Sequence, residues 1–538
     1  MINFIINQIK YLLVYFKIKK NISLSIKSEI KSSKIILCEL NFFSSYQIPM
    51  FYIINFFLKI KKFKVVGYYN YDVLKHSLSE TSYIKFCRKY LAHFIIKKIY
   101  NHFGVKYFLY PKNQKNSNVI YYLKRIKKIK NKKKLLNLKL SNILIGDLLY
   151  DTYCKKYSEP TVNFNDNRFY DLCLEFIKLF YFWINFFKKN KEIETIIGCH
   201  LVYSYGIIIR IALHFKKKVF LASLDRIKKV NKNFPYEVHY KDFDSKYFKE
   251  IDYNDRKSII DKGTKLLKNS LSGKFSFHNS ITTLKKNSFN KKIQPSLISR
   301  SDNVKILIST HDFYDAPHAW GDHKLFADYY EWLVFLLKLS KKTKYDWYIK
   351  THPDLVGKYG VAQRKSRLII EKLLESYPNI KTLPPNYSNY RIIKAKINFV
   401  ITCHGSVAYQ YPFFGIPVIT SSSCSPFNDY NFNINPKSRS DLRNLILKLD
   451  KIKNNIKINK KEIFNYYSVS YIFYNTVNWL FSYKKYIKFI HGWHRRDSVD
   501  LYYYWLSNFN DIKLTNVNNF LNKFFQSRAS MTNIILNK

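Results

Sequence analysis

A histidine lies two residues after the end of each of two predicted strands in the C-terminal half of the sequence. His352 lies in the segment 350–354 and is followed by Pro353, and His404 lies in the segment 401–408. Proline after a strand ends its hydrogen-bonding ladder, which leaves the preceding histidine at the edge of the sheet. A histidine there can donate a hydrogen bond to a phosphate oxygen or, when protonated, offset the charge of a departing diphosphate. For His352 alone, a histidine that merely closes a loop is an equal alternative.

The residues after His404 favour a phosphate site. Gly405 lets the backbone approach a ligand closely, and Ser406 can cap the following helix while free N–H groups of that helix face an anion. A plain tight turn is the alternative, but this turn comes about fifty residues after His352 in the same predicted sheet. Hydroxyls after the last strand reach the same edge, or else form a polar loop. The predicted phosphate-binding edge comprises His352, Pro353, His404, Gly405, Ser406, Ser421 and Ser422.

A third polar cluster follows the first strand of this half. It contains His311, Asp312, Asp315 and His318. A metal site would also need His323, but these histidines do not share one helical face and Pro317 interrupts the segment, so no metal site is predicted. A loop that lines a cleft between domains is the favoured interpretation.

The N-terminal half offers candidates for a general base. Asp147 and Asp151 follow the predicted strand 142–146, and His200 follows another. Each could deprotonate an attacking hydroxyl. Taken singly, each is more simply a helix cap or a loop histidine. We carry Asp151 and His200 forward as candidate catalytic residues, together with His352 as the group that faces the leaving diphosphate.

Short β-branched runs alternate with helical spacing around these residues. In the C-terminal half the predicted strands are 304–309, 346–350, 398–402 and 416–420, separated by helices at 325–339, 362–376 and 388–394. Strand–helix alternation indicates a mostly parallel sheet that is covered on both faces. The right-handed crossover rule then places the loops after the strands on one edge, where ligands bind in open α/β sheets.

The N-terminal half repeats this alternation less regularly. Its predicted strands are 34–38, 64–68, 105–110, 142–146, 195–199 and 219–222, with helices at 46–59, 81–100, 169–187 and 204–215. The stretch 269–303 is polar, with little hydrophobic period, and is the expected linker. We therefore expect an N-terminal domain at 1–268, a second domain at 304–483, and a helical segment at 484–538 that packs back on the first domain. The predicted fold class is α/β, with two Rossmann-like domains facing across a cleft.

The amino-acid composition limits the classes of protein to which this chain can belong. The chain has 538 residues, 47% of them hydrophobic, which suits two large domains and excludes a disordered chain. Its net charge of +55 invites a nucleic-acid interpretation, but the lysines are spread along the whole chain and accompany many Ile, Asn, Tyr and Phe residues, as in an AT-rich coding sequence. We expect no specific nucleic-acid partner, although this charge favours anionic surfaces such as the cytoplasmic leaflet of a membrane.

Cysteine usage and the N-terminus bear on location. The seven cysteines form no CxxC pair, which argues against a disulfide framework or a structural zinc and for a reducing compartment, hence the cytoplasm. The first 21 residues are apolar but interrupted by Gln8 and Lys10, and they lack a small-residue cleavage site. We expect an amphipathic surface helix there that can touch a membrane.

These segments resemble bacterial capsule and surface-polysaccharide biosynthesis proteins of the GT-B glycosyltransferase type. The matching stretches are KTHPD at 350–354, HGSVAYQYPFFGIPVI at 404–419, GDLLYDTY at 146–153 and HDFYDAPHAWGD at 311–322. The resemblance implies two Rossmann-like domains with a nucleotide donor held mainly by the second, and no bound metal or cofactor. Many relatives carry Glu in the helix after the glycine, where this chain has Tyr409 and Gln410, so the donor is left open.

The expected function is transfer of a sugar from a nucleotide-sugar donor to a glycan or lipid-linked glycan at the cytoplasmic face of the membrane. One alternative is a polyol-phosphate transferase of the CDP-glycerol type on the same fold. Another is a non-catalytic binder of polyanions or membranes, which would need neither His352 nor Gly405.

Overall fold

The protein is described by a computed structural model in which the following residues are placed: 2–22, 32–41, 43–70, 94–111, 117–224, 226–237, 246–272, 289, 295–321, 325–352, 360–422, 426–473, 479–480, 499–509, 512 and 514–532. Among the predicted site residues, Pro353 lies outside the described residues. The predicted helix 81–100 is described only from residue 94, and residues 94–102 are helical.

The second domain is built on a five-stranded parallel sheet in the order β11-β10-β9-β12-β13. The strands are β9 (Lys305–Ser309), β10 (Asp346–Lys350), β11 (Ile380–Leu383), β12 (Phe399–Thr402) and β13 (Val418–Thr420). Renumbered from the first strand, this order is 3-2-1-4-5, the order of a Rossmann sheet, and the chain reverses direction across the sheet between β9 and β12.

The first domain repeats this order in a six-stranded sheet, β3-β2-β1-β6-β7-β8, of which the last pair is antiparallel. The strands are β1 (Ile35–Glu39), β2 (Lys64–Tyr68), β3 (Tyr107–Leu109), β6 (Ile193–Gly198), β7 (Lys218–Ala222) and β8 (Ile227–Lys229). Its reversal point lies between β1 and β6. The predicted fold class, α/β with two Rossmann-like domains, is confirmed.

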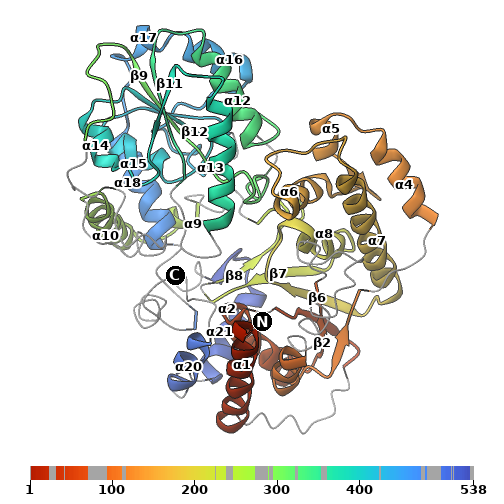
Figure 1. The fold of residues 1–538 in the computed structure, drawn as a ribbon. Helices are drawn as coiled ribbons and strands as arrows, with labels where there is room; N and C mark the ends of the chain where they lie inside the picture. The colour runs from red at the N-terminus through yellow and green to blue at the C-terminus, as the bar shows by residue number, and fades with distance from the viewer. Residues whose placement is uncertain are drawn as a thin grey trace.

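Helices cover both faces of each sheet, as Figure 1 shows. The helices of the first domain are α1 (Ile2–Asn21), α2 (Ser44–Asn55) with a π-helical turn (Phe56–Ile60), α4 (Ser117–Lys127), α5 (Lys132–Leu136), α6 (Gly146–Tyr157), α7 (Asn167–Lys189) and α8 (Gly206–His214), the last preceded by a 3₁₀ turn (Tyr203–Tyr205). The helices of the second are α12 (Tyr329–Ser340), α13 (Gly360–Leu374), α14 (Asn389–Lys394), α15 (Val407–Phe413), α16 (Arg439–Ile446), α17 (Leu449–Ile452) and α18 (Lys460–Ser468), followed by a π-helical turn (Val469–Phe473).

Alternation along the strands explains the layers. In β9, Ile306 and Ile308 pack with α12 and α16 in one core, whereas Leu307 packs with α14, α15 and α18 in the other. In β6, Ile196 and Ile197 divide between the two cores of the first sheet in the same way. Because both faces are buried, these strands are nearly continuous apolar runs, which is typical of parallel sheets.

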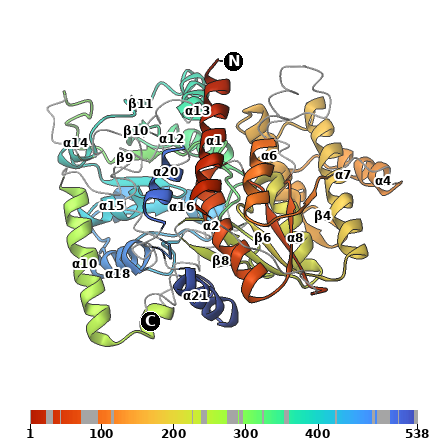
Figure 2. The same ribbon diagram turned by 90° about the horizontal axis from the view of Figure 1, so that it is seen from below.

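Helix α10 and part of the expected linker belong to the second domain, and the C-terminal helices pack on the first domain as expected. Helix α10 (Tyr253–Leu271) crosses the expected boundary at 268 and packs on α18 of the second domain, where Leu267 and Leu271 are buried. Ile298, in the expected linker, is buried in the same core. Near the C-terminus, α20 (Asp500–Ser507) and α21 (Leu514–Gln526) lie beside α1 and α2 and share the core of the first domain (Figures 1 and 2).

Two sequence-based details are corrected. The strand predicted at 142–146 is reduced to β5 (Ile143–Leu144), which pairs with β4 (Lys139–Leu140) in a separate hairpin and does not join the main sheet. Ser406 makes no side-chain cap hydrogen bond to α15, and the helix has seven residues. The helix ends at Phe414, which is its C-cap, and the following Gly415 has a φ of +85°.

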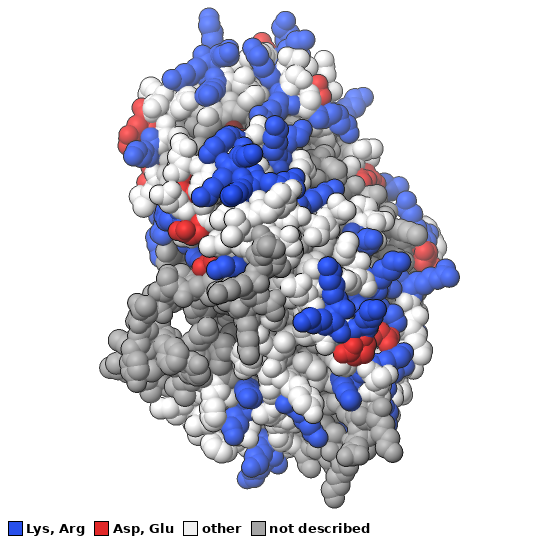
Figure 3. All heavy atoms as spheres, turned by 90° about the vertical axis from the view of Figure 1, so that its right-hand side faces the viewer, with Lys and Arg blue, Asp and Glu red and all other residues white. Residues whose placement is uncertain are grey.

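The surface reflects the basic composition. In the face shown in Figure 3, groups of Lys and Arg are scattered from top to bottom of the described surface, with few acidic residues among them. Among the described residues, no helix has the length and apolarity that crossing a membrane requires.

Candidate functional site

The loops after β9 and β12 meet at the reversal point of the second sheet, the usual ligand position in this type of sheet. The ring of His311, after β9, contacts the backbone of His404, after β12: its Nε2 pairs with the carbonyl oxygen and lies 3.2 Å from the backbone nitrogen. His311 also stacks on Tyr329, with ring centroids 5.1 Å apart. The sequence therefore brings two of its predicted histidines together across the reversal point.

Gly405 is required at this contact for two reasons. Its φ of +107° is a conformation that L-residues rarely adopt. A Cβ at this position would lie 3.0 Å from Cε1 and 3.3 Å from Nε2 of His311. The glycine thus allows the turn and makes room for the histidine ring.

Gly405→Ala is expected to destabilise the protein more than Gly415→Ala. Both glycines have positive φ, so both substitutions carry a backbone strain of about 1–3 kcal/mol. A Cβ added to Gly415 would meet no neighbouring atom within 4 Å, whereas one added to Gly405 would meet His311. Urea denaturation of the two variants measures the difference. Equal losses would show that His311 yields freely and that the contact does not constrain the turn.

Three buried hydroxyl groups line the carboxyl edge of the second sheet. Thr310 follows β9, Thr351 follows β10 and Ser421 follows β13, and their exposed fractions are 4%, 5% and 1%. None of the three side-chain oxygens has a hydrogen-bond partner among the residues that the structure describes. Because a buried hydroxyl without a partner costs about 1–3 kcal/mol, such a set at the ligand edge of a sheet indicates a place for a polar ligand.

The other predicted residues of this edge differ in exposure. His404 is buried, with its ring stacked on Trp320 at 5.6 Å, so it shapes the loop. Ser406 is exposed, Ser422 is buried and His352, two residues after the end of β10, is half-buried. All of them lie at or next to the carboxyl ends of β10, β12 and β13, as the sequence predicts.

Lys350 is a buried lysine at the end of β10. Its Nζ donates to Oδ1 of Asn389 at 2.6 Å, and burial lowers its pKa to about 7. A lysine with this pKa is only partly charged near neutral pH. It therefore does not give the edge a fixed positive charge.

The reversal point of the first sheet holds a carboxylate–imidazole–phenol chain. Nδ1 of His200, after β6, lies 3.0 Å from Oε1 of Glu237, and its Nε2 lies 2.7 Å from the hydroxyl of Tyr46. The other oxygen of Glu237 accepts from the N–H of Leu201 at 2.6 Å. Because a carboxylate accepts only, Nδ1 carries the proton and Nε2 is left as the basic nitrogen, to which Tyr46 donates. The side chain of His200 is 36% exposed.

The charges around His200 suit a base. Burial would raise the pKa of Glu237, but His200, the N–H of Leu201 and Lys228 hold it below the ordinary value. Glu39, at the end of β1, accepts from the N–H of Cys199 at 2.7 Å, and burial raises its pKa to about 7. Glu237 therefore supplies the permanent negative charge beside the imidazole.

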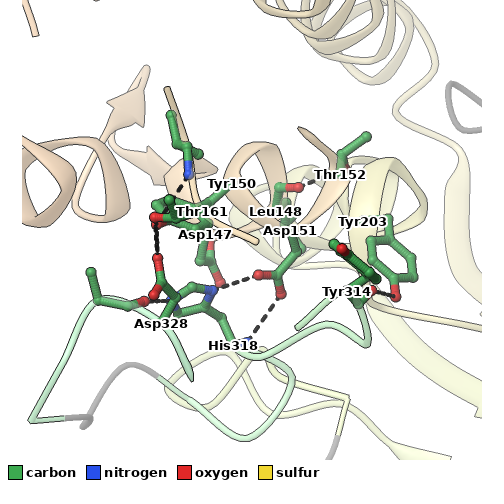
Figure 4. Close-up of polar contacts among 12 residues, drawn as sticks. Asp147, Leu148, Tyr150, Asp151, Thr152, Thr161, Tyr203, Tyr314, His318 and Asp328 are labelled. Carbon is green, nitrogen blue, oxygen red and sulfur yellow. Dashed lines mark hydrogen bonds and ion pairs between the residues drawn. The ribbon is translucent and has the colours of Figure 1, made fainter. Parts of the chain in front are cut away.

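Asp151, the other candidate base, connects the two domains instead (Figure 4). Its carboxylate lies 2.5 Å from Nδ1 of His318 and accepts from the backbone N–H of the same residue at 3.1 Å. Nε2 of His318 donates to the carbonyl of Ala327 at 2.8 Å. The side chains of Asp151 and His318 are 4% and 2% exposed. Asp151 is thus enclosed and already paired, which makes it unsuitable for deprotonating a substrate hydroxyl.

Further contacts join the two domains beside the Asp151–His318 pair, and together these contacts form the seam between domains. The hydroxyls of Tyr150 and Thr161 donate to Asp328, which also caps α12 by accepting from the N–H of Glu331. The hydroxyl of Tyr203 donates to the carbonyl of Tyr314 at 3.2 Å (Figure 4). Tyr203 follows β6 of the first sheet and Tyr314 follows β9 of the second, so this contact joins the carboxyl edges of the two sheets.

The remaining predicted acids have structural positions. Asp147 forms a buried two-point ion pair with Arg210, at 2.5 and 2.6 Å; burial would raise its pKa, but the guanidinium lowers it below the ordinary value. Asp312 accepts from the N–H of Tyr314 in its own loop and from the hydroxyl of Ser366 on α13. Asp315 is 76% exposed, 3.8 Å from Lys155. None of the three lies free at either reversal point.

No group of three His, Cys, Asp or Glu side chains that could hold a metal occurs among the described residues, and His323 lies outside them. The described cysteines are buried and unbridged: Cys38, Cys154, Cys173, Cys199 and Cys403. Four residues of the two edges were not predicted from the sequence, namely Tyr46, Glu237, Thr310 and Thr351. The two threonines could have been found, because each directly follows a predicted strand.

Comparisons with known proteins give only weak alignments. The sequence matches no protein-family model and no curated protein. A UDP-GlcNAc 2-epimerase from Neisseria meningitidis bound to UDP-GlcNAc aligns at 12% identity and a TM-score of 0.24, over 81% of this chain and 98% of that one. A glycosyltransferase from Rickettsia africae aligns at 10% and 0.23, over 92% and 99%. The wall teichoic acid polymerase TagF aligns at 11% and 0.20, over 95% and 98%. Similarity of this size assigns neither a family nor an activity to the chain.

Proposed function

We propose that this protein is a glycosyltransferase that moves a sugar from a nucleotide-sugar donor to a hydroxyl group of a surface or capsular glycan. The donor lies against the carboxyl edge of the second sheet, and the acceptor lies at the reversal point of the first sheet. The observation that carries the proposal is the pairing of these two edges: one offers buried hydroxyls that lack a partner among the described residues, and the other offers an oriented imidazole.

On the donor side, Thr310, Thr351 and Ser421 donate to phosphate oxygens, and Gly405 keeps the backbone close to the same ligand. His352 faces the leaving nucleotide and offsets its charge when protonated. The support for this assignment is that the three hydroxyls are buried, directly follow strands β9, β10 and β13, and lack partners among the described residues. We propose no bound metal or cofactor for this step.

On the acceptor side, Nε2 of His200 takes the proton from the attacking hydroxyl as that oxygen bonds to the anomeric carbon and the bond from this carbon to the nucleotide breaks. Glu237 keeps the proton on Nδ1 and stabilises the imidazolium that forms. Tyr46 occupies the basic nitrogen at 2.7 Å until an acceptor hydroxyl replaces it. Asp151 is left out of this mechanism because it is enclosed and paired with His318.

Nucleotide binding tests the donor side. A thermal-shift series with CMP, CDP, UDP and GDP is expected to find one nucleotide that stabilises the protein, by about 2.7 kcal/mol at a hundred times its Kd. Thr351→Val together with Ser421→Ala should weaken that nucleotide at least tenfold, because each hydrogen bond to a charged group contributes roughly 1.5–3 kcal/mol.

Ser340→Ala is the matched control for the donor variant. Ser340 is as buried as Ser421, but its hydroxyl donates to the carbonyl of Leu337 at the end of α12. This variant should bind the nucleotide as the parent does. A series in which none of the four nucleotides stabilises the protein would overturn the donor assignment. Phosphorus in the transferred group would reassign the reaction to polyol-phosphate transfer.

A further inference from the structure

Helix α1 has one apolar face that is buried in the first domain. Val14 and Ile18 are fully buried, and Tyr11 packs edge-on against Tyr502 of α20, with ring centroids 6.3 Å apart. Lys17 lies over the ring of Tyr503 at 4.5 Å. These contacts fix the helix against α20, so its orientation is determined and its opposite side faces outward (Figures 1 and 2).

The outward side of α1 is apolar as well. Ile6, Ile9, Leu12, Leu13 and Phe16 are exposed by 44%, 52%, 36%, 51% and 55%. At 3.6 residues per turn they form one continuous stripe opposite Val14 and Ile18. Scattered exposed apolar residues need no explanation, but a stripe of five along one helix indicates a surface that meets something apolar.

Lysines border this stripe. At the same helical spacing Lys10 and Lys17 lie along one side of it, Lys19 lies along the other, and Lys20 lies at its C-terminal end. The sequence of α1 contains no Asp or Glu. An apolar stripe between lysines is the arrangement that an interfacial helix uses, in which the apolar side chains enter the lipid and the ammonium groups meet anionic headgroups.

We infer that α1 docks the protein on an anionic lipid bilayer, with its axis in the plane of the interface. A second copy of this chain fits the stripe less well, because two copies of α1 would bring their lysines together without an acidic residue to pair them. The docking does not depend on the proposed transfer reaction, and it can be tested in the absence of any donor or acceptor.

Vesicle co-sedimentation tests this inference with the full chain. We expect binding to vesicles of phosphatidylcholine with roughly a third phosphatidylglycerol that is weakened by salt, and much weaker binding to pure phosphatidylcholine. Leu13→Gln with Phe16→Gln should weaken the binding roughly ten- to hundredfold, because each side chain loses the burial of its exposed half. Lys10→Gln with Lys19→Gln should weaken it by about fivefold per lysine.

Tyr253→Gln with Leu368→Gln is the matched control, since these residues are exposed by 67% and 62% on helices that belong to the second domain. This variant should bind vesicles as the parent does, and unchanged thermal denaturation shows that each variant is folded. Binding that is equal in the α1 and control variants would overturn the inference. So would a vesicle-free dimer that the Leu13→Gln, Phe16→Gln variant abolishes, because the stripe would then be an interface between copies.

Discussion

Replacing His200 with Asn is expected to lower kcat for transfer about 10²- to 10⁴-fold, the range that a positioned general base contributes. Nε2 of His200 is the basic nitrogen because its Nδ1–H donates to Glu237, and an amide has no comparable basicity. Stabilisation by the bound nucleotide should be unchanged, since the proposed donor site lies on the other domain. Initial rates with a saturating donor measure the effect, and full activity of His200→Asn would place the base elsewhere.

Glu237→Gln tests whether Glu237 orients and stabilises the imidazole of His200 or only supports the fold. The carboxylate stabilises the imidazolium, so its loss should shift the acidic limb of the pH–rate profile to lower pH, in addition to lowering kcat about tenfold or more. Tyr46→Phe is the control at the other nitrogen: it removes the hydroxyl that occupies Nε2 and should leave kcat within a few-fold. A uniform loss in Glu237→Gln without any shift of the profile would contradict the positioning role.

Asp151→Ala is expected to reduce the free energy of unfolding by about 1–3 kcal/mol for each buried donor that loses its acceptor. Asp151 receives two hydrogen bonds from His318, whose other ring nitrogen faces the carbonyl of Ala327. The alanine would leave the backbone N–H and Nδ1 of His318 without this acceptor inside the seam between domains. Urea denaturation followed by both fluorescence and circular dichroism measures the loss.

Asp315→Ala is the matched control for the seam. Asp315 also pairs across the domains, with Lys155 at 3.8 Å, but it is 76% exposed, so its loss should cost no more than about 1 kcal/mol. If Asp151→Asn abolished transfer while unfolding stayed unchanged, Asp151 would be a catalytic base after all and not a connection between domains.

The sequence predicts the strands and the loops that follow them well, but it predicts contacts between distant residues poorly. β2 and β10 have their predicted bounds, and the candidate donor residues cluster at the predicted edge, because periodicity and chain order determine both. β11 was missed, since its two central residues are exposed at the edge of the sheet and lack an apolar run. Local pattern is enough for the strands and for the loops that directly follow them.

The site features that the sequence does not predict depend on contacts between residues far apart in the chain. Glu237 is 37 residues from His200 and reaches it only through the turn after β8. His318 is 167 residues from Asp151 and belongs to the other domain. No local pattern distinguishes a base from a paired carboxylate in such cases. Asp151 and His200 looked equivalent in sequence, and only their surroundings separate them.

The path of the chain also sets an order of assembly. The core of the second domain is made from α10 onward and is complete by α18, a continuous stretch of sequence. One of the two cores of the first domain needs Trp505, Leu521 and Phe524, which come after the second domain in the sequence. During synthesis, the half that is made first therefore has to wait until α20 and α21 have left the ribosome, while the half that is made second can fold before it.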